Sequence, residues 1–387
     1  SKIQSDKKAL AFKVLTNFFH LNAIILQFKV EWPSLFLGLF RSINVLGQLT
    51  DYSLSTNCIF TEIDSEENYY LNIKLMTALP FCLIAASSIF WGVVRLFKRI
   101  DHLKEKVLGS GSALIFLIHP FLMKFMLTLY ACEEVAEMTW LSIDLSIMCW
   151  TSNHKFHVLA LGLPSLVLWG GIVPALNFIL LKRRCIRLEE ESTRYMMGFQ
   201  YQGYNPKDFY WEFVILLRKE LMILWAVFLS TMEQTQAVAG SFIILASFII
   251  QLRFKPFAEE HYNLLEEFAL LASHSICVSA VFLNSRELDS VEENFMFIVV
   301  LMFHLVFVLL WLRVSMQGSM AKLLSKYPRL SRLCCNVILY SVPSTQFSKE
   351  YLKVMPNISF SRLPQTPNIS FSSRTEEVSG TGQHLDQ

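Results

Sequence analysis

Residues 157–181 read HVLALGLPSLVLWGGIVPALNFILL, and residues 294–314 read NFMFIVVLMFHLVFVLLWLRV. A helix needs roughly 20 mostly apolar residues to cross a hydrocarbon core about 30 Å thick, and both stretches meet that length. The composition agrees, because 53% of the 387 residues are hydrophobic and only 17% are charged, against about 25% in a typical soluble protein. We therefore expect an all-α, polytopic transmembrane helical bundle.

The apolar pattern predicts about eight spans, and two segments near the start of the chain are ambiguous. Residues 10–28 carry Lys13 and His20, so this segment either crosses the bilayer or lies flat at its interface. Residues 34–49 are apolar with a helical period but contain Arg41, and we expect an interfacial helix on the outer face. The candidate spans lie at residues 10–28, 71–97, 112–131, 157–181, 210–231, 236–252, 262–284 and 294–315.

The segments between the spans alternate in charge, and this alternation predicts the orientation of the chain. Lys and Arg are retained on the cytoplasmic side of membrane proteins, so the basic segments should be cytoplasmic and the acidic ones should lie outside. Both termini are then cytoplasmic, in the plasma membrane or another membrane of the secretory pathway. The basic segments are 98–107, 182–194, 253–256 and 322–332, and the acidic ones are 61–67, 133–144 and 285–293.

The chain divides into a cytoplasmic N-terminal segment (1–9), a membrane domain (10–315) and a tail (316–387). The tail is rich in Ser, Pro and Thr, which predicts a disordered cytoplasmic segment of low complexity. It repeats the motif PNISFS, in which Asn357 and Asn368 match the glycosylation pattern, but a cytoplasmic tail would carry no glycan. Because the chain begins at a serine, we expect it to be the C-terminal part of a longer protein.

The eight cysteines include a pair that flanks one acidic outer segment. Cys132 and Cys149 lie at the end of one span and just before the next, where an oxidising environment would let them form a disulfide. The alternative is free thiols. Cys58 is then the odd cysteine of the outer face. Cys334 and Cys335 follow the last span among basic residues, where palmitoylation is plausible.

The most costly residues are charges inside the predicted spans, which by default mark a function or a compensating partner. The fifth span carries Glu212, Arg218 and Lys219, and the seventh enters from the same side with Glu266 and Glu267. We expect an ion pair between one of the two cations and one of the two acids of the seventh span. Such a pair either holds the helices in register or forms part of a gate at the inner end of an ion pathway.

Other polar residues suggest a pathway and an outer mouth. Lys124 and His119 lie in the third span and His274 in the seventh, where they would line a polar path if they faced one another. The acidic residues of the outer segment would concentrate cations at a mouth, or simply form a solvated loop. These acidic residues are Glu133, Glu134 and Asp144.

No motif points to catalysis, a cofactor or a metal. No histidine pair has the spacing of a zinc site, and Gly109-Ser-Gly-Ser is only a short loop before a span. A net charge of +2 gives no field that would draw nucleic acid. The expected partners are the lipid bilayer, cations and further copies of the chain.

Several short motifs occur in a fixed order between residues 10 and 315. They are Lys13 to His20 (KVLTNFFH), Trp32-Pro33, Cys149-Trp150 with His154, Pro174, Tyr210-Trp211-Glu212 leading to Arg218-Lys219, and Arg253 to Phe257 (RFKPF) leading to Asn263 and Glu266. Together they resemble the TRP-like C-terminal domain, a multi-pass membrane region of large proteins of ciliates and other protists that is related to fungal TRP-like proteins.

The resemblance implies a TRP-like helical bundle that often follows a cysteine-rich ectodomain, and it suggests cation permeation or sensing. The chain departs from a TRP channel because the loops at 230–235 and 285–293 are too short for a pore helix and a selectivity filter. Two alternatives therefore stand beside permeation. The chain is a membrane anchor or receptor region for a cysteine-rich ectodomain, or a transporter of lipids or small solutes.

Overall fold

A computed structural model describes residues 2–39, 65–285 and 289–326. The chain divides into two compact units, residues 1–318 and 319–387, and only the first is considered below. Several expectations lie outside the described residues: the second half of the interfacial segment 34–49, most of the tail, Cys58, Cys334, Cys335, Asn357 and Asn368.

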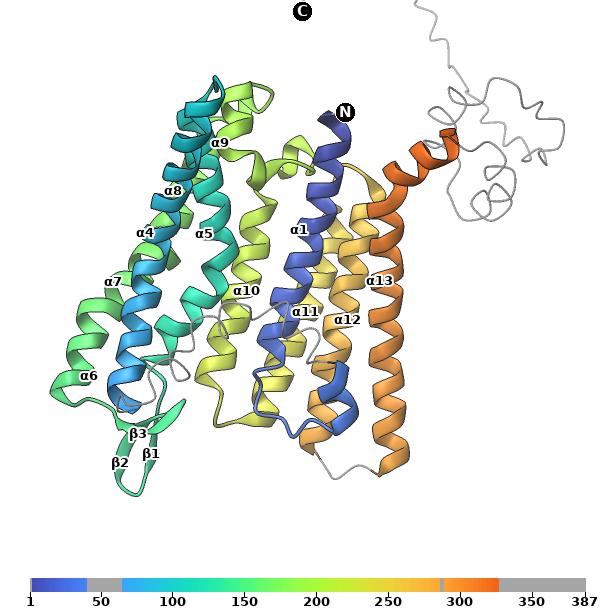
Figure 1. Cartoon of the computed structure of the whole chain (residues 1–387). Coiled ribbons are helices and arrows are strands. Elements are labelled where there is room, and N and C mark those ends of the chain that lie inside the picture. The colour runs from blue at the N-terminus through green and yellow to red at the C-terminus, as the bar shows by residue number, and fades with distance from the viewer. Residues whose placement is uncertain (1, 40–64, 286–288, 327–387) are drawn as a thin grey trace, which may run out of the picture. The chain divides into compact units, whose positions relative to one another are not determined.

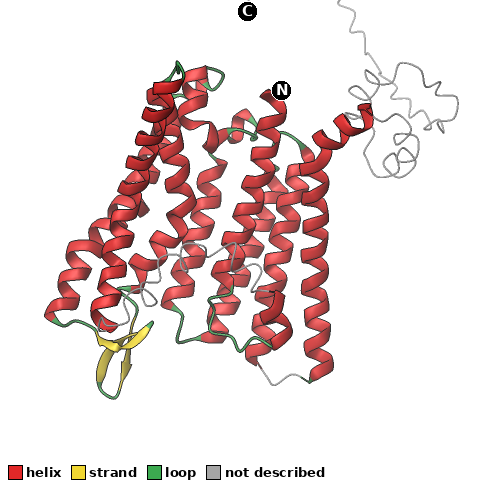
Figure 2. Cartoon of the chain, viewed as in Figure 1, coloured by secondary structure: helices red, strands yellow, loops and turns green. Residues whose placement is uncertain are grey.

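Long helices lying side by side form the first unit, so the expected helical class is confirmed (Figures 1 and 2). The amino end of α1 and the α4–α5 turn lie at one end of this bundle, and the α10–α11 turn lies at the other (Figure 1). The long helices are α1 (Lys2–Ile25), α4 (Ser65–Phe97), α5 (Leu103–Thr128), α10 (Trp211–Phe228), α11 (Glu233–Phe254), α12 (Glu260–Ser285) and α13 (Ser290–Lys326).

Six helical segments of the described chain are long and apolar enough to cross a membrane. The most apolar window of α5 is 67% buried, whereas those of α4 and α13 are only 11% and 17% buried. The outer helices therefore present apolar side chains, as expected where a bundle meets lipid. The six segments are Glu66–Phe97, Leu103–Thr128, Ser152–Arg183, Glu233–Phe254, Glu260–Ser285 and Ser290–Met316.

The two helices missing from this group, α1 and α10, carry charges and lie inside the bundle. Helix α1 packs against α10 and α12 and buries Ala11, Val14 and Phe18 at the three- and four-residue spacing of one helical face. Most of the segment 10–28 is therefore part of the core of the bundle.

The span expected at 157–181 is irregular. It runs through α6 (Ser152–His157), a π-helical stretch (Val158–Gly162), α7 (Leu163–Ser165), a second π-helical stretch (Leu166–Ile172) and α8 (Val173–Arg183). In the second stretch the amide of Val173 bonds to the carbonyl of Leu168, five residues back. The next donor in that pattern would be residue 174, which is proline and has no N–H. The carbonyl of Trp169 is instead bound by the His119 ring, whose Nε2 lies 3.0 Å away.

Three segments expected as loops are ordered elements. The acidic segment forms an antiparallel sheet of β1 (Cys132–Val135), β2 (Met138–Leu141) and β3 (Asp144–Met148). The basic segment after α8 continues into α9 (Glu191–Tyr201), which packs on α5. Gly109-Ser-Gly-Ser lies within α5, where Ser110 bonds to Ser87 on α4 and Ser112 bonds to Asn177 on α8.

Candidate functional site: a buried cluster of charges

Helix α10 carries the predicted charges on the face that packs into the bundle. Glu212, Arg218 and Lys219 are all buried there, among Ile215, Leu216, Met222 and Ile223. The spacing of three to four residues per turn places polar and apolar side chains on the same inward face. Burial of three charges is costly unless each finds a partner, so the partners define the site.

Arg218 forms the expected ion pair with Glu266 on α12. Its Nη2 atom donates to Oε1 of Glu266 at 2.8 Å, and both side chains are buried. Glu267, the neighbouring acid, is only half-buried and makes no ion pair among the described residues. The one-residue step rotates Glu267 by about 100° around the helix, away from Arg218. Glu266 alone is therefore the partner on α12.

Glu212 pairs with a residue on α1. The Nζ atom of Lys13 lies 2.5 Å from Oε2 of Glu212 and also donates to the carbonyl of Phe199. The Tyr204 hydroxyl donates to the same carboxylate oxygen at 2.9 Å. Burial and the nearby Glu212 carboxylate raise the pKa of Tyr204 well above its usual value, so this hydroxyl keeps its proton and remains a donor. The costly lysine of α1 is thus neutralised inside the protein.

Lys219 has neutral partners. Its Nζ atom donates to Oδ1 of Asn17 at 2.7 Å and lies 3.3 Å from Nδ1 of His20. Both partners are on α1, so the contact adds a second polar link between α1 and α10. Lys219 therefore belongs to the cluster, but the expected alternative in which it pairs with an acid of α12 is not what the structure shows.

The three residues proposed to line a polar path lie in different surroundings. His119 contacts the Trp169 carbonyl and lies 3.4 Å from Oε1 of Glu220. His274 lies 3.4 Å from the Ser241 hydroxyl on α11. Lys124 borders a cavity of about 10 Å³, which is near the minimum for a single water molecule. The described contacts therefore do not assemble these residues into a path.

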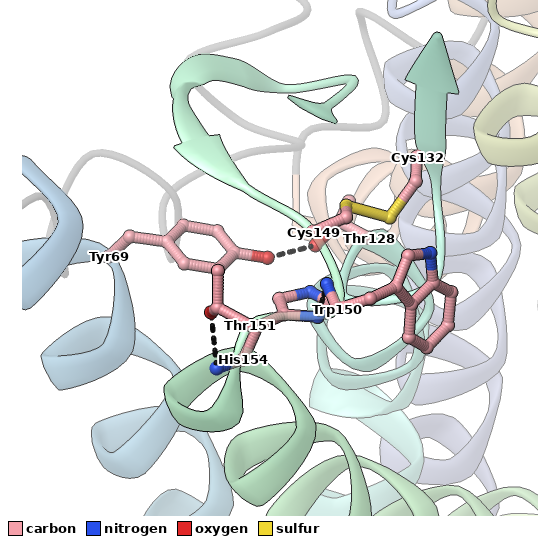
Figure 3. The surroundings of a disulfide bond; sticks show 7 residues. All are labelled: Tyr69, Thr128, Cys132, Cys149, Trp150, Thr151 and His154. Atoms are coloured by element: carbon pink, nitrogen blue, oxygen red, sulfur yellow. Dashed lines mark hydrogen bonds between the residues drawn. A yellow bond between two sulfur atoms is a disulfide. The ribbon is translucent and has the colours of Figure 1, made fainter. Parts of the chain in front are cut away.

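A disulfide between Cys132 and Cys149 closes the sheet at the other end of the bundle, as the sequence predicts (Figure 3). The segment after Cys149 turns directly into α6. There Thr151 caps the helix by accepting from the His154 amide, while Nδ1 of His154 accepts from the Trp150 amide (Figure 3). The sulfurs and the His154 ring are close enough to hold a metal, but oxidised cysteines offer no thiolate ligand.

The acidic residues of the sheet do not converge. Glu133 and Glu134 are neighbours on β1, and successive side chains of a strand point to opposite faces. Asp144 on β3 accepts hydrogen bonds from the amide and hydroxyl of Ser146, which fix the turn into that strand. The three carboxylates therefore do not all share one face of the three-stranded sheet, as a ring around a mouth would require.

Four residues were not predicted to belong to the cluster, namely Lys13, Asn17, His20 and Tyr204, although Lys13 and His20 were noted as polar residues of the first segment. A signal for three of them exists. Lys13, Asn17 and His20 are spaced four and three residues apart, so they form one polar stripe on an otherwise apolar helix. Such a stripe indicates a helix that faces other polar residues inside a bundle.

Comparisons with known proteins give one distant similarity. The chain is 26% identical over 250 residues to cysteine repeat modular protein A of Toxoplasma gondii. The match covers 62% of this chain but only 8% of that protein, so the chain spans a small fraction of the relative's length. No protein-family model matches the chain, and no solved structure matches it.

Proposed function

We propose that this chain is the membrane-embedded anchoring module of a longer surface protein, and that its buried charges hold the helices in register. The observation that carries the proposal is the way the charges are used. Lys13 with Glu212 and Arg218 with Glu266 are paired across three helices and withdrawn from solvent. Side chains that guide ions would instead face a water-filled path.

The proposed topology has eight crossing segments, the six apolar ones together with α1 and α10. At a rise of 1.5 Å per residue, α10 is about 27 Å long and α1 about 36 Å, close to the thickness of a hydrocarbon core. Their charges are tolerable in a membrane because they face the bundle and each other. The α4–α5 turn, the end of α8 and the turn after α8 carry the basic residues, and we assign that end of the bundle to the cytoplasm.

The distant relative supports an anchoring role in one respect. Its name describes a protein with modular cysteine repeats, and the matched part is 8% of its length. We propose by analogy that this chain also serves a much larger protein, with a cysteine-rich region outside the membrane. The bundle would then fix the position of that region at the surface.

The proposal is tested by reconstituting the purified chain in liposomes and measuring cation efflux and lipid scrambling. We expect neither to exceed the rate of protein-free liposomes, while the chain resists extraction from the membrane at alkaline pH. A cation-selective flux in the wild type would overturn the proposal in favour of a channel. Lipid scrambling would overturn it in favour of lipid handling.

A matched pair of variants makes the flux test sharper. Arg218→Ala removes a member of the buried cluster, whereas Lys255→Ala removes an exposed cation whose partner is the exposed Glu260. An anchoring module predicts lower thermal stability for Arg218→Ala, no change for Lys255→Ala, and no current in either. A current that appears in the wild type and is altered by Arg218→Ala would place the cluster in a gate.

A further inference from the structure

The turn from α4 into α5 borders an open hollow of about 410 Å³ on the surface of the protein. This volume falls within the range of roughly 300–1,000 Å³ that small-molecule sites occupy. Three cations line it: Arg95 in the last turn of α4, and Lys98 and Arg99 just after the helix ends. Asp101 lines the same hollow, so the site has a net charge of +2.

These cations are not used by the protein itself. Within the described chain, no carboxylate lies within ion-pair distance of Arg95, Lys98 or Arg99. Other basic residues are engaged: Lys106 lies over the Tyr195 ring at 4.7 Å, and Arg187 lies 3.9 Å from Glu190. An unpaired group of cations beside a hollow is suited to an external anion.

The apolar residues of the same turn indicate where that anion comes from. Leu96 and Phe97 are 82% and 86% exposed, although they end a helix apolar enough to cross a membrane. Their exposure is readily explained if they contact acyl chains at the boundary of the bilayer. Cations and apolar side chains then alternate at the depth where a lipid has its headgroup and its first methylene groups.

We propose that this hollow binds the headgroup of a membrane lipid that carries phosphate monoesters. A phosphate monoester has a charge of about −1.5 to −2 at pH 7 and three acceptor oxygens, which matches the net charge of the hollow. Two arginines can each bind such a group through two parallel hydrogen bonds. A lipid with a single phosphodiester offers less charge and fewer acceptors. The inference rests on the proposed membrane insertion, because only an inserted chain holds this turn at the lipid headgroups.

The test uses the full chain in nanodiscs of phosphatidylcholine. The probe is a short-chain phosphatidylinositol bisphosphate, compared with a short-chain phosphatidylserine and with the free inositol phosphate of the same headgroup. We expect the bisphosphate lipid to bind more tightly than the other two probes. Equal binding of phosphatidylserine at matched charge would overturn the assignment to monoesters, and equal binding of the free inositol phosphate would overturn the assignment to a lipid.

Two triple variants distinguish binding of the lipid at this hollow from its attraction to basic residues elsewhere on the same end of the bundle. Arg95→Ala/Lys98→Ala/Arg99→Ala should weaken binding of the bisphosphate lipid by roughly tenfold or more, since each cation near a membrane surface contributes substantially to binding of anionic lipid. Lys182→Ala/Arg183→Ala/Arg187→Ala removes the same charge from the end of α8 and the turn after it, and should change binding less than twofold. Equal weakening by both variants would overturn the site.

The nanodisc experiment can fail or succeed independently of the test of the proposed function. Both faces of a nanodisc are open to the probe, so the result does not depend on orientation, and binding does not depend on whether the chain conducts ions. Unchanged thermal unfolding of the first triple variant would show that lost binding is not lost folding. If that variant is unstable, the single change Lys98→Glu, which reverses one exposed charge, should weaken binding and must do so for the site to stand.

Discussion

The Nη2 atom of Arg218 lies 2.8 Å from Oε1 of Glu266, and the two side chains are only 8% and 2% exposed. This ion pair joins α10 to α12 in the interior. The pair between Lys255 and Glu260 is shorter, at 2.6 Å, but its side chains are 51% and 69% exposed. Length is therefore a poor guide to the importance of the two pairs, because solvent screens the exposed one and cannot reach the buried one.

Replacing only one of Arg218 and Glu266 should lower the stability of the protein far more than the double substitution does, when each is counted per residue replaced. Arg218→Met or Glu266→Gln alone leaves a buried charge without its partner, which costs about 3–5 kcal/mol in comparable cases. The double variant should cost clearly less than the sum. Thermal unfolding in detergent measures this, and Glu260→Gln, at the exposed pair, should change stability by less than about 0.5 kcal/mol. Strictly additive losses would show that the pair is not coupled.

The contact between His119 and the Trp169 carbonyl should depend on Pro174. His119→Leu leaves that buried carbonyl without a donor, at a cost of about 1–3 kcal/mol. Pro174→Ala restores an N–H five residues after Trp169, so it should reduce the cost of His119→Leu by at least half. A double-mutant cycle of unfolding free energies checks the coupling. Because Glu220 also lies near the ring, the cycle should be repeated with Glu220→Gln, which ought to leave it unchanged.

The close approach of α5 and α9 makes a glycine indispensable. A Cβ atom at Gly109 would overlap the carbonyl oxygen of Tyr195, whereas a Cβ at Gly92 on α4 would meet nothing within 4 Å. Gly109→Ala should therefore destabilise the chain by about 1–3 kcal/mol through overpacking. Gly92→Ala should be neutral or stabilise by up to about 1 kcal/mol through helix propensity. Equal unfolding temperatures for the two variants would contradict the packing of α9 on α5.

The sequence predicts what depends on local pattern. Apolar runs locate the long apolar helices, and the placement of Cys132 and Cys149 at the ends of one segment predicts their disulfide. The pair of Arg218 with Glu266 can also be predicted, because the two predicted spans that carry these charges would enter the membrane from the same side. Each of these inferences needs only the order of spans and the position of a residue along its helix.

The remaining features depend on contacts between segments far apart in the chain. Lys13 and Glu212 are separated by 199 positions, so the sequence around either residue does not identify its partner. In the sequence, Lys13 weakens the prediction of a span at residues 10–28, whereas in the structure it pairs with Glu212 inside the bundle. The π-helical stretch before Pro174 needs a histidine of another helix to satisfy it. Helix α9 is short and polar, and its helical state is stabilised by packing on α5 more than by its own propensity.

The disulfide should stabilise the sheet rather than the bundle. Its sequence separation is 17, and closing a loop of this size is worth about 3 kcal/mol in the chain-entropy account. Cys132→Ser/Cys149→Ser should raise hydrogen exchange across β1 to β3 while the core helices stay protected. Reductant should have the same effect on the wild type and none on the variant. Cys185→Ser, which removes a free thiol, serves as the control. Unaltered exchange after reduction would contradict the role of the bond.

The proposed orientation can be checked by labelling two matched positions with a membrane-impermeant maleimide. Glu137, in the turn between β1 and β2, and Glu189, before α9, are both exposed glutamates. In a background in which the six cysteines other than the disulfide pair are serine, Glu137→Cys should react on intact cells. Glu189→Cys should react only after the membrane is permeabilised, because the basic end of the bundle is retained in the cytoplasm. The reverse labelling pattern would show that the bundle has the opposite orientation in the membrane. Labelling of both positions on intact cells would show that the segments between them do not cross the membrane an odd number of times, and the assignment of eight crossing segments would fail with it.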